Sequence, residues 1–556
     1  MNRRSGPGRN WQLTFGGVLY WAVLGCFLVP VAFVLGPAVV QRKFGALLSE
    51  LLNSSVFAKT FAFSTAEAFL SAVGSLLLAL PGAYFFGLYN FKGKRYWQSA
   101  MVLPFMLPGI LVVLGLVAFY GQNGLLNLWL ERWFPTGGPR FDCLYGFWGI
   151  VIANIFYNFS FCLRILGESW ERIDHRLAEA AWTLGSSRWE VWYRIILPLL
   201  LPTIGYLLVL VFLYSFLSFT VVLVLGGYLY KTFEVMIYIE YNHKLNFNLA
   251  AVLVVVQGTL LGLGLYLQYF FNRRVRVQGV YSQNQTMLCW KTAPCKTGLL
   301  AGYLLLTGGF LIGPMLAILV RSLHRHGRIG NPLTVENYWL LFSERFSFAA
   351  GQGFGRVFTT SLLLAVGVGF LTTAVAYLLA RTRRKQRWGQ GDFWLQLPMG
   401  ISFLTFTVGL SRLGGTRFPS WVLIAWAQFI LAFPLVYSIL RTAWREVGES
   451  LLEAALLLGA DRKHLFVSLE LPLMRQALIT GWSYAVSFSL GDLAGVLMLG
   501  KGEVITLSVA IYRLIGHYHF HLATAAGVVF ILLSLCLYSL VLRWDTKGGW
   551  YHSNGR

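Results

Sequence analysis

Stretches without charged residues recur along the whole chain and predict how it is organised. Two of them contain a single acid each, Glu67 and Asp492, and the others contain no Asp, Glu, Lys or Arg. The stretches are residues 10–41, 60–91, 96–130, 143–163, 195–230, 245–272, 297–320, 357–380, 393–411, 418–440, 476–500 and 514–542. A helix needs about 20 apolar residues to span a bilayer. The pattern therefore predicts an all-α polytopic membrane protein with about twelve transmembrane helices.

The composition leads to the same conclusion. Hydrophobic residues make up 57% of the 556 residues and charged residues only 12%, against about 25% charged residues in soluble domains. A water-soluble surface needs more charge than this, and a disordered chain has fewer apolar residues. The composition therefore excludes a soluble enzyme and an intrinsically disordered protein.

The net charge is +23, from 45 Lys and Arg residues against 22 Asp and Glu residues. In a soluble protein this excess would suggest nucleic-acid binding, whereas in a membrane protein basic residues gather in cytoplasmic loops. With both termini cytoplasmic, most of the basic residues fall in cytoplasmic segments. We therefore expect that orientation and no nucleic-acid partner. The first apolar stretch is too long for a signal peptide and is expected to remain as the first helix.

One segment of the chain occurs twice. Residues 177–207 and 451–481 both contain Glu-Ala-Ala, a glycine six positions after the Glu, and a Leu-Pro pair whose proline lies thirteen positions after that glycine. An offset of 274 relates the copies over about 70 residues without a gap. Upstream the offset is 294, so the first half carries about twenty extra residues around 121–140. The chain is a tandem duplication of two homologous six-helix halves.

Because each half has an even number of spans, both halves run in the same direction through the membrane. Parallel repeats of this kind place a transport pathway between the halves, and a duplicated scaffold without transport is the alternative. The expected segments are 1–56 (N-terminal cytoplasmic tail, first helix and external loop), 57–271 (first transmembrane domain), 272–354 (cytoplasmic linker, seventh helix and external loop), 355–543 (second transmembrane domain) and 544–556 (cytoplasmic tail).

The repeated segment predicts a short helix, a turn and re-entry into the bilayer. Glu-Ala-Ala favours helix formation, Gly185 and Gly459 allow a turn with positive φ, and proline is tolerated in the first turn of the next helix. A passive amphipathic helix on the membrane surface is the simplest alternative. The same residues at the same spacing in both halves favour two equivalent docking surfaces instead.

These loops resemble the signature loop of importer permeases in the ATP-binding cassette (ABC) superfamily. The resemblance extends over about 57–270 and 355–541. It implies a type I importer permease fold in which each loop is a coupling helix seated in a groove of a separate ATPase subunit. The loop residues that it assigns are Glu179, Ala180, Ala181, Gly185, Pro198, Glu453, Ala454, Ala455, Gly459 and Pro472.

The chain lacks the motif that cradles the phosphates of ATP. It nowhere contains G-x-x-x-x-G-K-[ST], and the nearest match, Gly500-Lys501-Gly502, has no hydroxyl residue. We therefore expect a transport subunit without catalytic residues, bound cofactor or metal, in which partner chains use ATP. The resemblance implies two copies of an ABC ATPase subunit, an external substrate-binding protein and a location in the bacterial inner membrane.

Fused double-length permeases of this kind resemble two groups, the thiamine importers and the ferric-iron importers. Residues 120–124, 225–227 with 232–238, and 489–493 with 499–500 look more like the thiamine group. Tyr228 and Tyr230 depart from that pattern. Thiamine or its phosphates are thus the expected substrate, and ferric iron is the alternative. A secondary transporter driven by an ion gradient is less favoured, because it would need several acids or bases in mid-span.

Asp492 and the adjacent Gly491 are the candidate residues for the pathway of a cation. A bare carboxylate within a span is costly and usually faces a cavity or a partner, and Asp492 lies about midway along its stretch. The alternatives are an acid paired with a neighbouring helix and an acid near the external interface. Glu67 lies near the outer end of its own stretch and is expected at that interface.

Histidines in two predicted external loops raise the question of a metal. His517, His519 and His521 alternate with aromatic residues, and His324 and His326 lie in another loop. Imidazole is a common metal ligand, so a metal pathway would favour the iron alternative. We expect a rim of histidines without metal. The six cysteines form no compact framework, and Cys289 and Cys295 lack further ligands at zinc spacing, so a zinc site is not expected.

Overall fold

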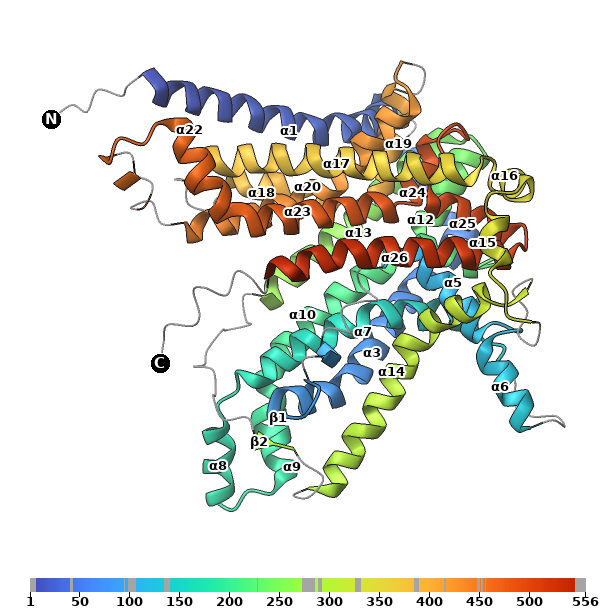
Figure 1. The fold of residues 1–556 in the computed structure, drawn as a ribbon, viewed down its shortest axis with the longest axis vertical. Coiled ribbons are helices and arrows are strands. Elements are labelled where there is room, and N and C mark those ends of the chain that lie inside the picture. Colours follow the sequence, from blue (N-terminus) through green and yellow to red (C-terminus); the bar gives the residue numbers. More distant parts are fainter. Residues whose placement is uncertain are drawn as a thin grey trace. The chain divides into compact units, whose positions relative to one another are not determined.

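The computed structural model is almost entirely helical (Figure 1). It describes residues 7–40, 44–94, 96–98, 107–134, 141–227, 229–272, 286–288, 293–325, 332–384, 390–414, 417–447, 451, 454–455 and 457–545. Within these ranges the only strands are β1 (Tyr89–Asn90) and β2 (Thr286–Met287), which pair in parallel. Glu453, Cys289, Tyr228, His326 and most of the linker between the halves lie outside the described residues.

Ten helices in the described part of the chain are long and apolar enough to cross a membrane. Each coincides with one of the predicted stretches. A bent pair, Asp392–Gly400 and Phe403–Gly414, meets at 96° and would make an eleventh span. The remaining stretch, 476–500, holds most of the 21-residue helix Leu471–Gly491 and all of the six-residue helix Ala494–Leu499. The predicted all-α polytopic membrane fold is thereby confirmed.

The chain divides into two compact units. The N-half unit comprises Gly45–Glu240 and Val255–Val335. Its core is formed by α3, α7 and α10, which pack against one another. Its elements besides the two strands are α2 (Phe44–Asn53), α3 (Ser55–Leu88), α5 (Gly109–Tyr120), α6 (Leu125–Trp133), α7 (Phe147–Glu171), α8 (His175–Thr183), α9 (Arg188–Val191), the π-helix η1 (Trp192–Ile196), α10 (Leu197–Phe216), α11 (Thr220–Leu225), α12 (Phe233–Tyr238), the π-helix η2 (Ile239–His243) and α14 (Pro294–Ser322).

The C-half unit comprises Met1–Phe44, Tyr241–Val254 and Glu336–Arg556, so α13 (Phe247–Asn272) is divided between the two units. Its core is formed by α17, α20 and α23. Its other elements surround these three. They are α1 (Pro7–Val40), α15 (Glu336–Leu340), α16 (Glu344–Ala350), α17 (Phe354–Thr382), α18 (Gln390–Gln396), the 3₁₀ turn η4 (Leu397–Gly400), α19 (Phe403–Gly414), α20 (Ser420–Glu446), α22 (Arg462–His464), the π-helix η5 (Leu465–Glu470), α23 (Leu471–Gly491), α24 (Ala494–Leu499), α25 (Leu507–Gly516) and α26 (Phe520–Asp545).

The duplication is visible in the helix bounds. α5 and α19 begin and end at positions that differ by 294, and α11 and α24 begin and end at positions that differ by 274. α3 and α17 also end 294 positions apart, and a π-helix leads into α10 as another leads into α23. The extra residues of the first half contain α6, which has no counterpart among the described residues of the second half.

Each unit includes the first helix of the other half. α1 packs against α19 in the C-half unit, and α14 packs against α5 in the N-half unit. Glycines at corresponding positions make these contacts close. A Cβ on Gly115 would lie 3.0 Å from the carbonyl oxygen of Pro314, and a Cβ on Gly409 would collide with that of Pro30. The two first helices thus dock in the same way, each on the corresponding helix, α19 or α5, of the other half.

Candidate functional site in the two repeated loops

The first loop, residues 174–196, begins with a capped helix and turns at a glycine. The Asp174 side chain accepts a hydrogen bond from the Arg176 backbone N–H at 3.0 Å and starts α8. Gly185 has φ +85°. Its N–H donates to the carbonyl of Trp182, and the next N–H, of Ser186, donates to the carbonyl of Ala181, both at 3.0 Å. These two bonds define a Schellman turn, which satisfies the last carbonyls of the helix.

Ser187 starts the next helix directly after this turn. Its hydroxyl accepts a hydrogen bond from the Glu190 N–H at 3.2 Å, and its own N–H donates to the Glu190 carboxylate at 2.9 Å. This reciprocal pair is a capping box. The chain then continues through η1 into α10 without a break, with Pro198 in the first turn of α10. The part of the loop after the Gly185 turn and α10 therefore form one continuous helix.

The second loop, residues 451–470, repeats this backbone. Gly459 has φ +87°, and the N–H of Ala460 donates to the carbonyl of Ala455 at 3.0 Å. Asp461 takes the place of Ser187 and accepts a hydrogen bond from the His464 N–H at 2.6 Å. This backbone hydrogen bond lowers the pKa of the Asp461 carboxyl. The chain continues through η5 into α23, which has Pro472 in its first turn.

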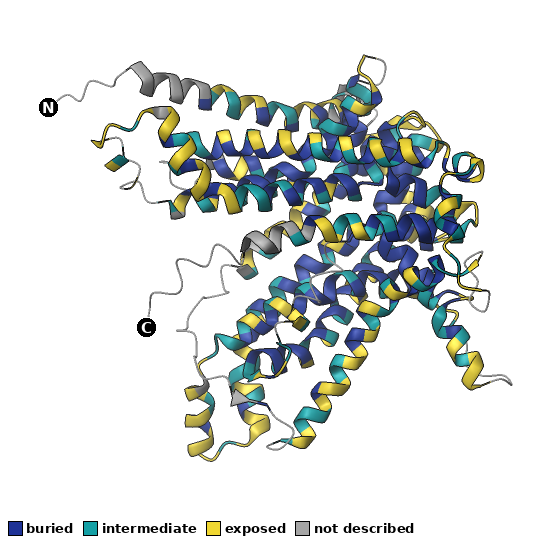
Figure 2. Cartoon of the chain, viewed as in Figure 1, coloured by how far each residue is buried: buried dark blue, intermediate teal, exposed yellow. Residues whose placement is uncertain are grey.

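Both loops present apolar side chains to the solvent. Leu184 and Leu458 precede the two glycines at corresponding positions and are 86% and 89% exposed. Around them Glu179, Ala180 and Ala454 are exposed, whereas Ala181 is buried. Figure 2 shows the exposure of α8 and α9. Other large exposed apolar residues of the loops are Leu177, Trp182, Trp189, Tyr193, Leu451, Leu457 and Val467. Exposed apolar surface of this extent in a soluble loop is typical of a protein interface.

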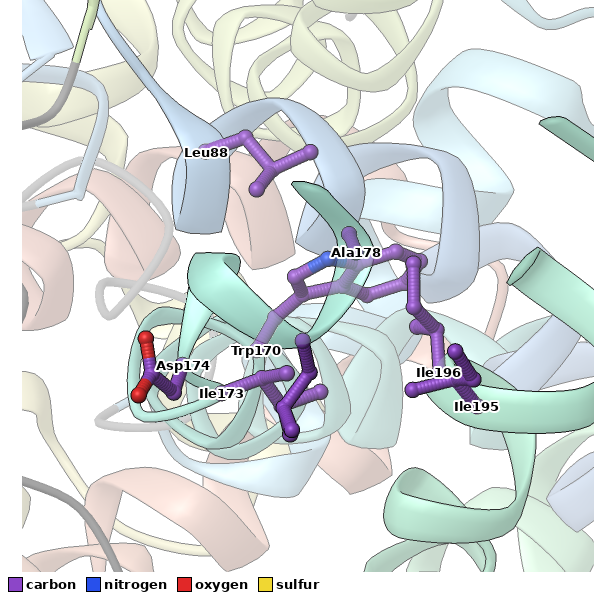
Figure 3. Close-up of a pocket in the computed structure, with 8 residues that line it drawn as sticks. Leu88, Trp170, Ile173, Asp174, Ala178, Ile195 and Ile196 are labelled. Carbon is purple, nitrogen blue, oxygen red and sulfur yellow. The ribbon is translucent and has the colours of Figure 1, made fainter. Parts of the chain in front are cut away.

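The base of the first loop encloses a small apolar hollow (Figure 3). Its volume is about 20 Å³, which is room for a single water. The hollow is therefore a packing crease and not a ligand site. The lining residues are Leu88, Trp170, Ile173, Asp174, Leu177, Ala178, Ile195 and Ile196.

Asp492 lies between two helices and not in the middle of one. α23 ends at Gly491, and Asp492 follows it before α24. One carboxylate oxygen accepts a hydrogen bond from the Gly495 N–H at 2.8 Å, and the other accepts one from Gln428 Nε2 of α20 at 3.1 Å. The side chain is buried. A role of Asp492 and Gly491 in a substrate pathway stays a prediction.

Comparison with known proteins decides the family. A family model described as the binding-protein-dependent transport system inner membrane component matches residues 76–277 and 373–547, more than half of the chain. The chain belongs to this family. It is an ABC importer permease in two matching segments, as the repeated loops predicted.

Several curated relatives cover most of this permease. The thiamine transport system permease protein of Haemophilus influenzae is 27% identical over 86% of this chain and 87% of its own length. The protein of the same name from Escherichia coli is 25% identical over 86% and 87%. A probable ABC transporter permease protein of Sinorhizobium fredii is 24% identical over 82% of both chains. The family implies transport without catalysis by the permease itself, and partners that bind substrate and hydrolyse ATP.

Glu67 is placed differently from the prediction. We expected it at the external interface, but its side chain is 0% exposed and lies in the core of the N-half unit of the permease. One carboxylate oxygen accepts hydrogen bonds from Asn154 Nδ2 at 2.5 Å and from Ser71 Oγ at 3.0 Å. Glu67 is the thirteenth residue of the 34-residue α3, so it lies well inside that helix. Its hydrogen bond from Asn154 directs the side chain toward α7. Its other oxygen has no hydrogen-bond partner among the residues that the structure describes.

In the part of the chain that the structure describes, the histidines of the last predicted external loop form no closed cluster. His517 is exposed, and the rings of His519 and His521 lie edge to face with centroids 5.9 Å apart. Among the residues that the structure describes, no three His, Cys, Asp or Glu side chains are placed to hold a metal ion.

The sequence analysis missed a group of ion pairs in the C-half unit of the permease. Glu470 pairs with Arg381 of α17 and with Arg384, two residues after the end of that helix. A second acid, Asp392, pairs with Arg383, the neighbour of Arg384, and with Arg441 of α20. Asp392 also accepts a hydrogen bond from Tyr437 Oη at 2.5 Å. The available signal was the density of arginines at the ends of two predicted spans, which the positive-inside rule alone was taken to explain.

Proposed function

We propose that this permease imports thiamine or thiamine phosphates across the bacterial inner membrane. Two copies of an ABC ATPase subunit would dock on the first and second loops, and an external substrate-binding protein would deliver the substrate. The curated relatives named for thiamine transport cover more than four fifths of the chain. The observation that carries the coupling part is the shared turn at Gly185 and Gly459: both glycines have positive φ, the next N–H donates to the carbonyl five residues earlier, and a capped helix that continues into a long apolar helix follows.

The loops suit this role for a mechanical reason. Leu184 and Leu458 offer apolar contacts at the same place in each half, so two identical ATPase subunits would meet equivalent surfaces. Each loop is continuous with α10 or α23 through a π-helix. A push on the loop when the ATPase dimer closes would therefore move a whole membrane helix. Alternation between outward-facing and inward-facing states follows if both halves are pushed together.

Residues with affinity for a cation remain candidates for the pathway. Thiamine is an organic cation with aromatic rings, and such cations favour carboxylates and aromatic faces. Asp492 and Gly491 are proposed to line the pathway, at the break between α23 and α24 where the backbone is not tied into a helix. Both termini are proposed to be cytoplasmic, as the distribution of basic residues favours.

One uptake experiment tests substrate and coupling together. The permease is expressed with the ATPase and binding protein encoded beside it, in cells without their own thiamine uptake, and the accumulation of labelled thiamine and of ferric iron is measured. We expect thiamine to accumulate and ferric iron not to. Accumulation of ferric iron alone would favour the alternative substrate, and accumulation driven without ATP would contradict the transporter class.

The coupling arm uses the double variant Gly185→Val with Gly459→Val. A β-branched residue is strained at positive φ, so the loops should lose their shape while the membrane helices stay inserted. We expect ATPase co-purification and thiamine uptake to be lost. Gly367→Val is the matched control, since Gly367 also has open space around it but no positive φ. Unchanged co-purification in the double variant would contradict docking at these loops.

A further inference from the structure

Glu470 is the last residue of η5, where the second loop passes into α23. Its side chain is 1% exposed and is surrounded by residues of α17. Arg381 Nη2 lies 2.6 Å from one carboxylate oxygen, and Tyr377 Oη donates to the same oxygen at 3.4 Å. Arg384 Nη1 lies 3.5 Å from the other oxygen. Two side chains of α17 and one from the residues directly after it thus converge on one carboxylate of the loop.

The contact between α17 and η5 involves two residues of each element. Tyr377 and Arg381 are four residues apart on α17, and Phe466 and Glu470 are four residues apart in η5. Arg381 lies over the Phe466 ring, with its Cζ 5.5 Å from the centroid, and the Tyr377 ring lies 6.3 Å from the Phe466 ring. Both residues of α17 therefore contact both residues of η5.

Trp444 of α20 closes the other side of this cluster. Its ring lies 5.8 Å from the ring of Tyr377, and Arg384 lies over it at 5.7 Å. The guanidinium groups are held by rings as well as by the carboxylate, which fixes their direction. α17, α20 and α23 run beside one another in this unit, as Figure 1 shows.

The first half has no such cluster at the corresponding positions. With the offsets of the repeat, Glu470 corresponds to Ile196, Arg381 to Gly87 and Tyr377 to Ala83. Trp444 corresponds to Trp170, which is kept. A Cβ on Gly87 would lie 2.7 Å from the Cβ of Trp170. The base of the first loop is thus close-packed and apolar where that of the second is charged.

We propose that Glu470 is a positioning residue that clamps the second loop to α17, so that the second loop, α23 and α17 move as one body while the first loop can shift against α3. This proposal rests on the proposed function, since it assigns the two loops different parts in transmitting the ATPase movement. The physical reason is the free-energy cost of separating the second loop from α17. A buried carboxylate loses its cations only at a large penalty, whereas apolar surfaces can slide past one another without losing their burial.

The test measures the rigidity of each loop against its neighbouring helix by spin labels. In a variant whose six cysteines are replaced, one pair of labels is placed at Lys463 and Leu371, and a second pair at Trp189 and Leu77. All four sites are exposed, and the two pairs occupy corresponding positions of the repeat. Distance distributions are recorded by pulsed electron resonance in lipid nanodiscs, with and without ATPase and ATP.

We expect a narrow distribution for the second-half pair that ATP does not change, and a broader one for the first-half pair. Glu470→Gln should broaden the second-half pair to the width of the first-half pair, and Arg381→Lys should keep it narrow. Glu168→Gln is the control, because Glu168 forms an ion pair with Arg164 at 3.1 Å on the surface. A second-half distribution that stays narrow in Glu470→Gln would overturn the proposal.

A second readout separates this proposal from the proposed function. In Glu470→Gln the ATPase should still co-purify, while thiamine transported per ATP hydrolysed should fall about fivefold or more, as expected for a lost coupling interaction. Unchanged transport per ATP would overturn the clamp. If no ATPase co-purifies even with the unmodified permease, the docking function fails, yet the spin-label distances still decide whether Glu470 holds the loop.

Discussion

In the first half, the base of the loop that turns at Gly185 is formed by apolar side chains such as Trp170, Ile195 and Ile196. In the second half, the base of the loop that turns at Gly459 is formed by Glu470 and the arginines that pair with it. The backbones of the two loops share the turn, the capped helix and the π-helix. Apart from the tryptophan that both halves keep, Trp170 and Trp444, the side chains beneath them differ. The backbone has therefore been kept where an equivalent partner would dock, and the side chains have diverged where each loop meets its own half.

The buried acids of the two cores differ in the same manner. Asn154 of α7 and Gln428 of α20 occupy corresponding positions, and each donates to a buried carboxylate. In the N-half unit the carboxylate is Glu67 of α3, whereas in the C-half unit it is Asp492 after α23. An amide on the same helix thus binds an acid that comes from a different element. Glu67 itself corresponds to Ser361, whose hydroxyl accepts from the Leu507 N–H at 2.8 Å.

The largest expected effect comes from removing these amides. Asn154→Leu would leave the Glu67 carboxylate with only the hydroxyl of Ser71, and we expect a loss of about 3 kcal/mol in the free energy of unfolding. Gln428→Met should cost about 2 kcal/mol, because Asp492 keeps a backbone N–H as donor. Reversible unfolding in mixed detergent measures both. Adding Glu67→Gln to Asn154→Leu should restore part of the loss. Equal losses in the two single variants would show that the acids are held alike.

The repeated features are those that the sequence could predict. A glycine at fixed spacing from Glu-Ala-Ala and Leu-Pro marks a turn between two helices, since both neighbours and the required φ are local properties. The number of spans was predicted closely, because apolar length is local: about twelve were expected, and the described residues have ten, or eleven with the bent pair. Gly185 and Gly459 therefore have the predicted backbone, and ten of the predicted spans are present in the described chain.

The errors arose where several elements meet. Glu67 was judged by its distance from the end of a charge-free stretch, but α3 begins at Ser55, five residues before that stretch. A run of apolar residues also does not reveal where a helix breaks, so the end of α23 at Gly491 was not predicted. The Glu470 cluster needs α17 and α20 beside η5. Only the folded chain brings those three elements together.

An intermediate effect is expected from crowding the base of the first loop. Gly87→Ala would place a Cβ 2.7 Å from the Cβ of Trp170, which neither backbone can easily accommodate, and we expect a loss of about 1.5 kcal/mol. Gly167→Ala is the matched control on the facing helix, because its Cβ would be 3.8 Å from its nearest neighbour. Thermal unfolding in detergent compares the two. A harmless Gly87→Ala would mean that the first half does not need a close contact where the second half has Arg381.

The smallest effect concerns the caps, where the halves use different residues for the same purpose. Ser187→Ala removes an N-cap and should weaken the first loop by about 1 kcal/mol. Asp461→Ala should weaken the second loop in the same direction, whereas Asp461→Asn keeps an oxygen that can accept from the His464 N–H. Hydrogen-exchange protection of the Glu190 and His464 amides measures both caps locally.

Acidity should act differently on the Glu190 and His464 amides, because the Glu190 N–H is bound by the neutral hydroxyl of Ser187 and the His464 N–H by the carboxylate of Asp461. The Asp461 pKa is lowered by the hydrogen bond from the His464 N–H, so the charged cap stabilises the loop above the ordinary Asp pKa of about 3.9. This contribution disappears as the pH falls through the lowered pKa. Protection of the His464 amide, corrected for intrinsic exchange, should therefore stay constant from neutral pH to about 5 and decline only in stronger acid. In Asp461→Asn this decline should vanish. A decline that persists in Asp461→Asn would assign the acid sensitivity of the second loop to another group.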